Sequence, residues 1–331
     1  IPQQVFPIEQ IEHIDPRQNY FSVNIGGNIA PKDSFFERGK ANIRYTGDSH
    51  SSSEFNVLFK PEFVFPLEEI SIKLGGDFDY LAGSFKRDFL NESGISYGFL
   101  KAGLIPSLSY QNEELAVSLG IGVYLGMNTE ANTSNFAMYP KINASYRLDE
   151  AVILYAGVEG GPRKNTYYDF KEENPFISPT LTIKPSRNIY EAFGGIKGLF
   201  ENVFGYNFRA SYGKTENKAL FQANPFKPFS SGFEGYEYHN SFNVIYDDVD
   251  VLSVFGEVKL TLSERFSIGV NANYFNYSLT EEAQAWNLPD FKASLFSDFN
   301  ITKELYGGAS IFFVGERNDL IQKSGTPMEM T

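Results

Sequence analysis

Hydrophobic and polar residues alternate along much of the chain, most clearly between residues 254 and 277. Apolar or small residues take every second position from Val254 to Leu262 and again from Phe266 to Tyr274, and most positions between them are polar. Successive side chains of a β-strand point to opposite faces. The pattern therefore predicts a β-hairpin with one apolar and one polar face and a turn at 263–265.

The same two-residue period recurs along the chain and predicts about fourteen strands in total. It is clear at 70–80, 115–125, 152–158 and 204–212. A single long strand is predicted from 241 to 262. The run 55–65 also alternates, but Pro61 has no N–H to donate to a sheet, which weakens the prediction there.

The predicted connections alternate in length. Short turns are expected near residues 67, 112, 149, 201, 264 and 303. Longer polar links are expected near 50, 88, 130, 175, 226 and 282, the longest being loops at about 160–188 and 214–238. Outer-membrane barrels have short periplasmic turns and longer extracellular loops, whereas a soluble sandwich has no reason for this alternation. We therefore predict a single all-β domain over residues 1–331, a transmembrane antiparallel up-and-down β-barrel.

This fold assigns water and lipid to opposite faces of each strand. The turn at 263–265 is expected at the periplasmic rim, with Val258 and Val270 toward lipid and Asn271 toward water. Aromatic residues near strand ends, such as Phe65 and Tyr274, would form interfacial girdles. The charged residues expected to face an aqueous lumen are Lys73, Asp77, Asp79, Arg209, Glu257 and Lys259.

Composition removes several classes of function. The net charge of −13 argues against a nucleic-acid partner, which needs clustered Lys and Arg. The chain has no cysteine, so disulfides and cysteine metal sites are impossible. No run of about eighteen apolar residues predicts a transmembrane helix. A soluble all-β binding protein remains the remote alternative.

Several short motifs in the second half carry a family resemblance. They are Tyr-Asp-Phe at 168–170, Glu-Asn-Pro-Phe at 173–176, Ser-Pro-Thr at 178–180, Tyr-Asp-Asp-Val at 246–249, Ala-Trp-Asn-Leu-Pro-Asp at 285–290 and Phe-Val-Gly-Glu-Arg at 313–317. In this order they resemble plug-less relatives of TonB-dependent receptors of Bacteroidota. The resemblance implies a large outer-membrane barrel without a plug domain and gives no substrate. Because the chain starts in a predicted loop and ends without an aromatic-terminated strand, we expect flanking strands to lie outside it.

Candidate chemistry is sparse. The only histidines are His13, His50 and His239, and no known hydrolase, metalloprotease or phosphate-binding motif occurs, so we predict a non-enzyme without a cofactor. Asp247, Asp248 and Asp250 form a weak calcium candidate.

Aromatic residues in the long loops are candidates for ligand or partner binding, since exposed aromatics are favoured at interfaces. They are Tyr167, Tyr168, Phe170, Phe176 and Trp286. The favoured interpretation is that they pack the loops against one another.

Two functions remain open for such a barrel in the bacterial outer membrane. The first-ranked hypothesis is a structural or accessory subunit of an envelope complex for barrel assembly, secretion or nutrient capture. Its partners would be outer-membrane lipid and other outer-membrane or periplasmic proteins. The alternative is a TonB-receptor-like or porin-like transporter for an unknown solute, in which the lumen charges tune selectivity.

Overall fold

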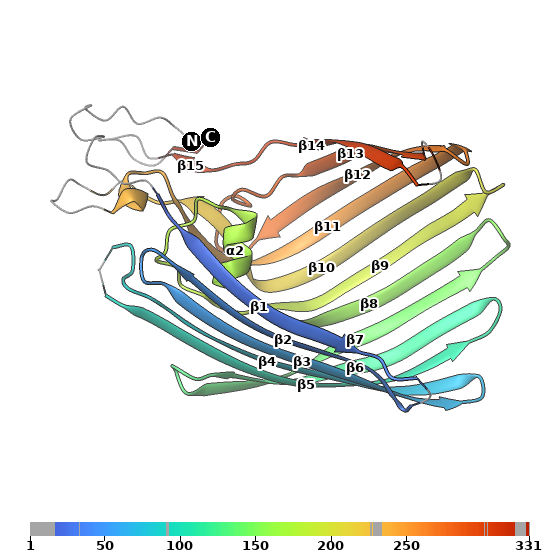
Figure 1. Ribbon diagram of the computed structural model, residues 1–331, viewed down its shortest axis with the longest axis horizontal. Coiled ribbons are helices and arrows are strands. Elements are labelled where there is room, and N and C mark those ends of the chain that lie inside the picture. The colour runs from blue at the N-terminus through green and yellow to red at the C-terminus, as the bar shows by residue number, and fades with distance from the viewer. Residues whose placement is uncertain are drawn as a thin grey trace.

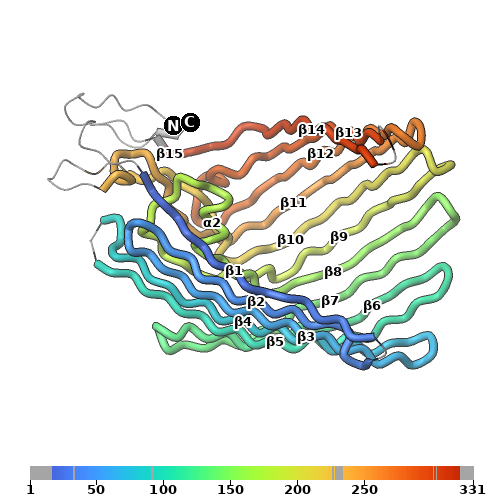
Figure 2. Tube along the Cα trace, in the orientation of Figure 1, coloured from blue at the N-terminus to red at the C-terminus, as the bar shows by residue number. Residues whose placement is uncertain are grey.

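Most of the protein is one curved antiparallel sheet, and a two-stranded sheet of β15 and β16 accompanies it. The computed structural model describes residues 17–32, 34–90, 93–225, 227, 234–300, 302, 304–321 and 329–330. Fourteen strands follow one another in sequence order, each paired with its sequence neighbours, which confirms the predicted up-and-down topology. The sheet is an open trough, and β1 and β14 form its two edges (Figures 1 and 2).

The first seven strands are β1 (Tyr20–Ile29), β2 (Phe36–Asp48), β3 (Ser53–Leu67), β4 (Ile70–Phe85), β5 (Ile95–Gln111), β6 (Leu115–Asn128) and β7 (Thr133–Arg147). The next seven are β8 (Ile153–Arg163), β9 (Ser186–Phe200), β10 (Phe204–Ala223), β11 (Phe242–Ser263), β12 (Phe266–Leu279), β13 (Phe291–Asn300) and β14 (Tyr306–Val314). The remaining elements are α2 (Tyr167–Glu173), the 3-10 turn η1 (Gly235–Glu237), β15 (Leu320–Ile321) and β16 (Glu329–Met330). No described helix is long and apolar enough to span a bilayer.

The two faces of the sheet differ in chemistry as the alternation predicts. Helix α2 lies in the trough and defines the inner face (Figure 1). The outer face carries large apolar side chains that no part of the described chain covers, such as Leu104, Leu119 and Phe136. Val270 is 49% exposed there, and Val258 is its cross-strand partner. An apolar surface of this extent belongs against lipid.

Connections at the two ends of the sheet differ in length. One end, which we call the turn rim, has tight turns such as 68–69, 112–114 and 264–265. The other end, the loop rim, has the long connections 164–185, 224–241 and 280–290. Two of the predicted longer links, near 50 and 130, are in fact tight turns at the loop rim. Side-chain oxygens of Asp48 and Asn128 accept backbone N–H groups within them, which closes a turn in few residues.

The boundary predicted for the second long loop is wrong. Residues 214–223 belong to β10, so the loop begins after Ala223. A register shift between Thr215 and Lys218 interrupts the alternation within the polar run at 213–218, which is why the sequence has the character of a loop. The long strand predicted at 241–262 is confirmed as β11.

Strand β3 continues through Pro61. It pairs with β4 up to Phe59 and again from Glu62, while Lys60 and Pro61 have no partner on that side. On the other side, Pro61 still lies opposite Gly39 of β2. The proline therefore costs one local interruption of the ladder without ending the strand.

Val258→Arg tests the assignment of the outer face. An arginine near the bilayer midplane should lower the free energy of unfolding by about 2–4 kcal/mol. Urea unfolding of the protein in lipid vesicles would measure this value. The adjacent Glu257→Arg change, on the inner face, is the matched control and should cost about 1 kcal/mol or less. Equal losses for both variants would contradict the assignment.

Candidate functional site

Helix α2 is anchored by a carboxylate from the sheet. The first N–H groups of a helix have no partner within the helix. At the N-cap, the hydroxyl oxygen of Thr166 provides such a partner by accepting a hydrogen bond from the Asp169 N–H at 2.9 Å. Glu54 of β3 accepts from the N–H groups of Tyr167 and Tyr168 at 2.7 and 3.2 Å, and is only 2% exposed. The positive end of the helix dipole further stabilises this buried carboxylate.

Tyr167 extends this anchor to β2. Its hydroxyl donates to Asp48 at 2.7 Å, and Glu54 also accepts from the Tyr97 hydroxyl at 2.9 Å. Burial, together with the nearby Asp48 carboxylate, raises the pKa of Tyr167 well above its ordinary value. The hydroxyl therefore remains a donor over the physiological pH range.

An apolar cluster fixes the rest of the segment 164–185, which we call the inner segment. The rings of Phe85 and Tyr167 pack edge to face with their centres 5.0 Å apart. The rings of Phe170 and Phe221 pack in the same way with their centres 5.8 Å apart. The buried members of the cluster are Leu81, Phe85, Tyr97, Tyr167, Phe170, Ile177, Leu181, Ile183, Phe221 and Val244. The inner segment is thus packed against the inner face of the sheet at the loop rim.

Ion pairs join the base of the inner segment to the wall. Lys164 donates to Asp79 at 2.9 Å and to the side-chain oxygen of Asn56 at 2.8 Å. Within the wall, Lys101 of β5 donates to Asp77 of β4 at 2.9 Å. Asp77 also lies 3.5 Å from the Lys60 ammonium, whereas Asp79 has no second cation among the described residues, so loss of Lys164 would leave the buried Asp79 carboxylate without an ion pair.

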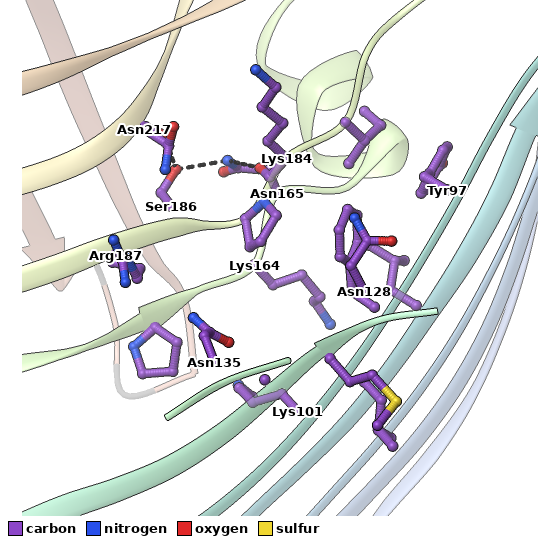
Figure 3. Close-up of a pocket in the computed structure, with 18 of the residues that line it drawn as sticks. Tyr97, Lys101, Asn128, Asn135, Lys164, Asn165, Lys184, Ser186, Arg187 and Asn217 are labelled. Atoms are coloured by element: carbon purple, nitrogen blue, oxygen red, sulfur yellow. Dashed lines mark hydrogen bonds between the residues drawn. The ribbon is translucent and has the colours of Figure 1, made fainter. Parts of the chain in front are cut away.

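A cavity of about 640 Å³ lies between the inner segment and strands β4–β10 (Figure 3). At its upper edge Asn165 donates to Ser186, which in turn donates to the backbone oxygen of Asn217. The basic and amide side chains that line it are Lys101, Asn128, Asn135, Arg163, Lys164, Asn165, Lys184, Arg187 and Asn217. A cavity of this size with convergent polar groups can hold a small solute.

The predicted lumen residues all lie on the inner face by strand register. Asp77 and Asp79 belong to the network around Lys101 and Lys164. Arg209 pairs with Glu191 at 2.7 Å, and Lys259 with Asp298 at 3.0 Å.

Lys73 and Glu257 make no ion pair within the part of the chain that the structure describes. The six predicted positions are therefore spread along the trough, and only Asp79 lines the cavity of Figure 3.

The loop aromatics serve mainly as packing. Tyr167, Phe170 and Trp286 are 0%, 4% and 2% exposed. The indole N–H of Trp286 donates to Glu282 at 2.7 Å. The guanidinium carbon of Arg44 lies over the Tyr168 ring, 4.0 Å from the ring centre. Phe176 alone of the five is largely exposed, at 55%.

The three aspartates of the calcium candidate do not share one face of β11, because Asp247 points to one face and Asp248 and Asp250 point to the other. Asp247 accepts the N–H groups of Glu281 and Glu282 and so holds the loop after β12. Asp248 lies on the opposite face of β11 and accepts from the Asn217 N–H. No group of three or more acidic, His or Cys residues could hold a metal ion among the described residues. This arrangement argues against the calcium site.

The sequence did not single out Glu54, Lys101 and Lys164. Glu54 and Lys101 could have been noted as charges at inner-face positions of predicted strands. Lys164 lay in a presumed loop, and its partner Asp79 is 85 positions away, so no local signal links them.

Comparisons with known proteins identify the fold. No protein-family model matches the chain, and no curated protein does. The pyoverdine outer membrane receptor FpvA of Pseudomonas aeruginosa PAO1 is similar with a TM-score of 0.57 at 12% identity, over 95% of this chain and 53% of the receptor. The FrpB iron transporter of Neisseria meningitidis (F3-3 variant) is similar with a TM-score of 0.59 at 9% identity, over 85% of this chain and 48% of the transporter.

The copper transporter OprC gives a TM-score of 0.54 at 12% identity, over 89% of this chain and 51% of the transporter. The chain thus spans about half the length of the structures it matches. Its fold is that of the barrel wall of outer-membrane receptors and transporters.

Glu54→Ala tests the anchor of α2. Loss of the acceptor leaves two backbone donors and the Tyr97 hydroxyl unpaired, so amide protection of Tyr167 and Tyr168 should fall about ten-fold or more. Hydrogen–deuterium exchange of peptides covering 164–175 would measure it. Glu62→Ala, on the same strand and face, removes an exposed pair with Arg38 and should leave this protection unchanged. Unchanged protection in the Glu54 variant would show that the cap is not needed.

Proposed function

We propose that the chain forms part of the wall of an outer-membrane transporter through which a small solute passes. The observation that carries the proposal is the two-faced trough. Its outer face is apolar, and its inner face holds charged and amide side chains around a cavity of about 640 Å³. A wall of this kind separates lipid from an aqueous passage. The similarity to a copper transporter, an iron transporter and a pyoverdine receptor supports the same function.

The inner segment is proposed to narrow this passage at the loop rim. It occupies the trough beside the cavity and is held by Glu54, Tyr167 and Lys164. The predicted lumen charges, from Lys73 and Asp77 at one side to Lys259 at the other, would set which solutes pass. The loop rim would be extracellular and the turn rim periplasmic.

The accessory-subunit hypothesis, ranked first from the sequence, receives less support. The matched structures are transporters and receptors. In addition, Tyr167 and Trp286, two of its proposed partner-binding residues, are buried within this chain. Contact with other envelope proteins, including a TonB-type energy source, remains part of the transporter proposal.

Single cysteines would test the aqueous passage directly, because the native chain has none to compete. Ser211 faces the trough, whereas its neighbour Ala210 faces outward. In vesicles containing the full-length protein, Ser211→Cys should react with a bulky water-soluble maleimide, and the label should reduce solute flux at least about two-fold by occupying the passage. Ala210→Cys should react far more slowly, because lipid covers it.

For each variant, the solute flux after labelling is compared with the flux of the unlabelled protein. Labelling of Ser211→Cys without any change in flux would argue against solute passage along this wall. Equal labelling of both variants would argue that the outer face is not in lipid.

A further inference from the structure

A second hollow lies on the inner face, nearer the turn rim than the cavity of Figure 3. Its volume is about 700 Å³, and it is lined by side chains of β8–β12. Arg163 lines both spaces and so marks where one meets the other. Nothing in the fold requires charge here, since strand pairing and the apolar outer face already stabilise the wall.

The charge of this hollow is opposite to that of the chain. Arg163, Lys197, Arg209 and Lys218 line it, and Glu191 is the only acidic residue among the described residues that do so. The whole chain carries a net charge of −13, so an excess of cations at this place departs from its composition. Low-dielectric walls would strengthen the local positive potential.

Two of these cations have defined partners. Arg209 pairs with Glu191 at 2.7 Å and lies 4.2 Å from the ring centre of Phe193. Lys197 lies 5.6 Å from the ring centre of Tyr155. These contacts orient both cations along the wall. Glu159, beside Glu191 in the strand register, binds Asn143 instead.

Arg163 and Lys218 have no carboxylate partner within the described chain. Arg163 and Lys218 both line this hollow, and the side chain of Lys218 is partly buried. Cations held together without a counter-charge destabilise one another, and an anion between them would relieve the repulsion. The amide and hydroxyl side chains of Asn188, Thr215 and Asn273 add further hydrogen-bonding groups around the same space.

We propose that this hollow binds a multiply charged anionic solute, such as an oligocarboxylate or an organic phosphate. This inference rests on the proposed function, because the bound anion would be a solute in passage between the two spaces. Arg163 and Lys218 would supply the main attraction, with Arg209 and Lys197 continuing the cationic path toward the turn rim.

Calorimetric titration of the detergent-purified full-length protein would test the site, with citrate as the anionic probe and sorbitol as the neutral one. At low ionic strength, citrate should bind saturably, and affinity should fall as salt screens the charges. The double variant R163Q/K218Q should bind citrate about ten-fold more weakly or worse. Sorbitol should give no saturable binding at the same concentrations.

Two controls separate charge from folding. K40Q removes a cation that has no ion pair among the described residues, on the inner face of distant β2, and should change citrate affinity less than about two-fold. The charge-conserving R163K/K218R variant should retain affinity within about three-fold. Equal losses in the neutral and charge-conserving double variants, or a loss in K40Q as large as in R163Q/K218Q, would overturn the proposal.

The absence of citrate binding at low salt would also overturn it. That failure is distinguishable from failure of the proposed function, because binding is measured without a membrane and solute flux is measured in vesicles. A protein that passes sorbitol but binds no citrate would remain a transporter without this anion site.

Discussion

The rest of the structure depends on the need to satisfy backbone hydrogen bonds where water is absent. In a bilayer, unpaired N–H and C=O groups are costly, so the wall must be a continuous ladder. All fourteen strands pair with their sequence neighbours, and the interruptions are short, such as Lys60 and Pro61 on the β4 side of β3 and the register shift between Thr215 and Lys218. Once the ladder is fixed, the two-residue period assigns every side chain to lipid or to the trough.

The trough then collects charges that a lipid-facing position would not tolerate. At the loop rim, the inner segment neutralises them: Lys164 meets Asp79, and Glu54 caps α2. Further along β8–β10, Arg163 and Lys218 are not neutralised by the described chain. Under the proposed function, this contrast distinguishes a structural part of the wall from a part that would be available to a solute.

Much of the fold could be predicted from sequence because strand periodicity is a local property. The faces of Val258 and Val270, the long strand β11 and the turn at 263–265 follow from the alternation alone. Prediction failed where the period breaks: the register shift after Thr215 hid the end of β10. It also failed for the links near 50 and 130, where Asp48 and Asn128 close turns in fewer residues than the polar runs implied.

The site was less predictable because its contacts are remote in sequence. The burial of Tyr167 and Trp286 depends on which strands lie opposite them.

The long sequence separation of these contacts also has a consequence for how the inner segment folds. The residue that caps α2 is 113 positions earlier in the chain, and an isolated seven-residue helix is unstable in water. The ordering of the inner segment therefore depends on the pairing of β2–β5, which supply its anchoring side chains.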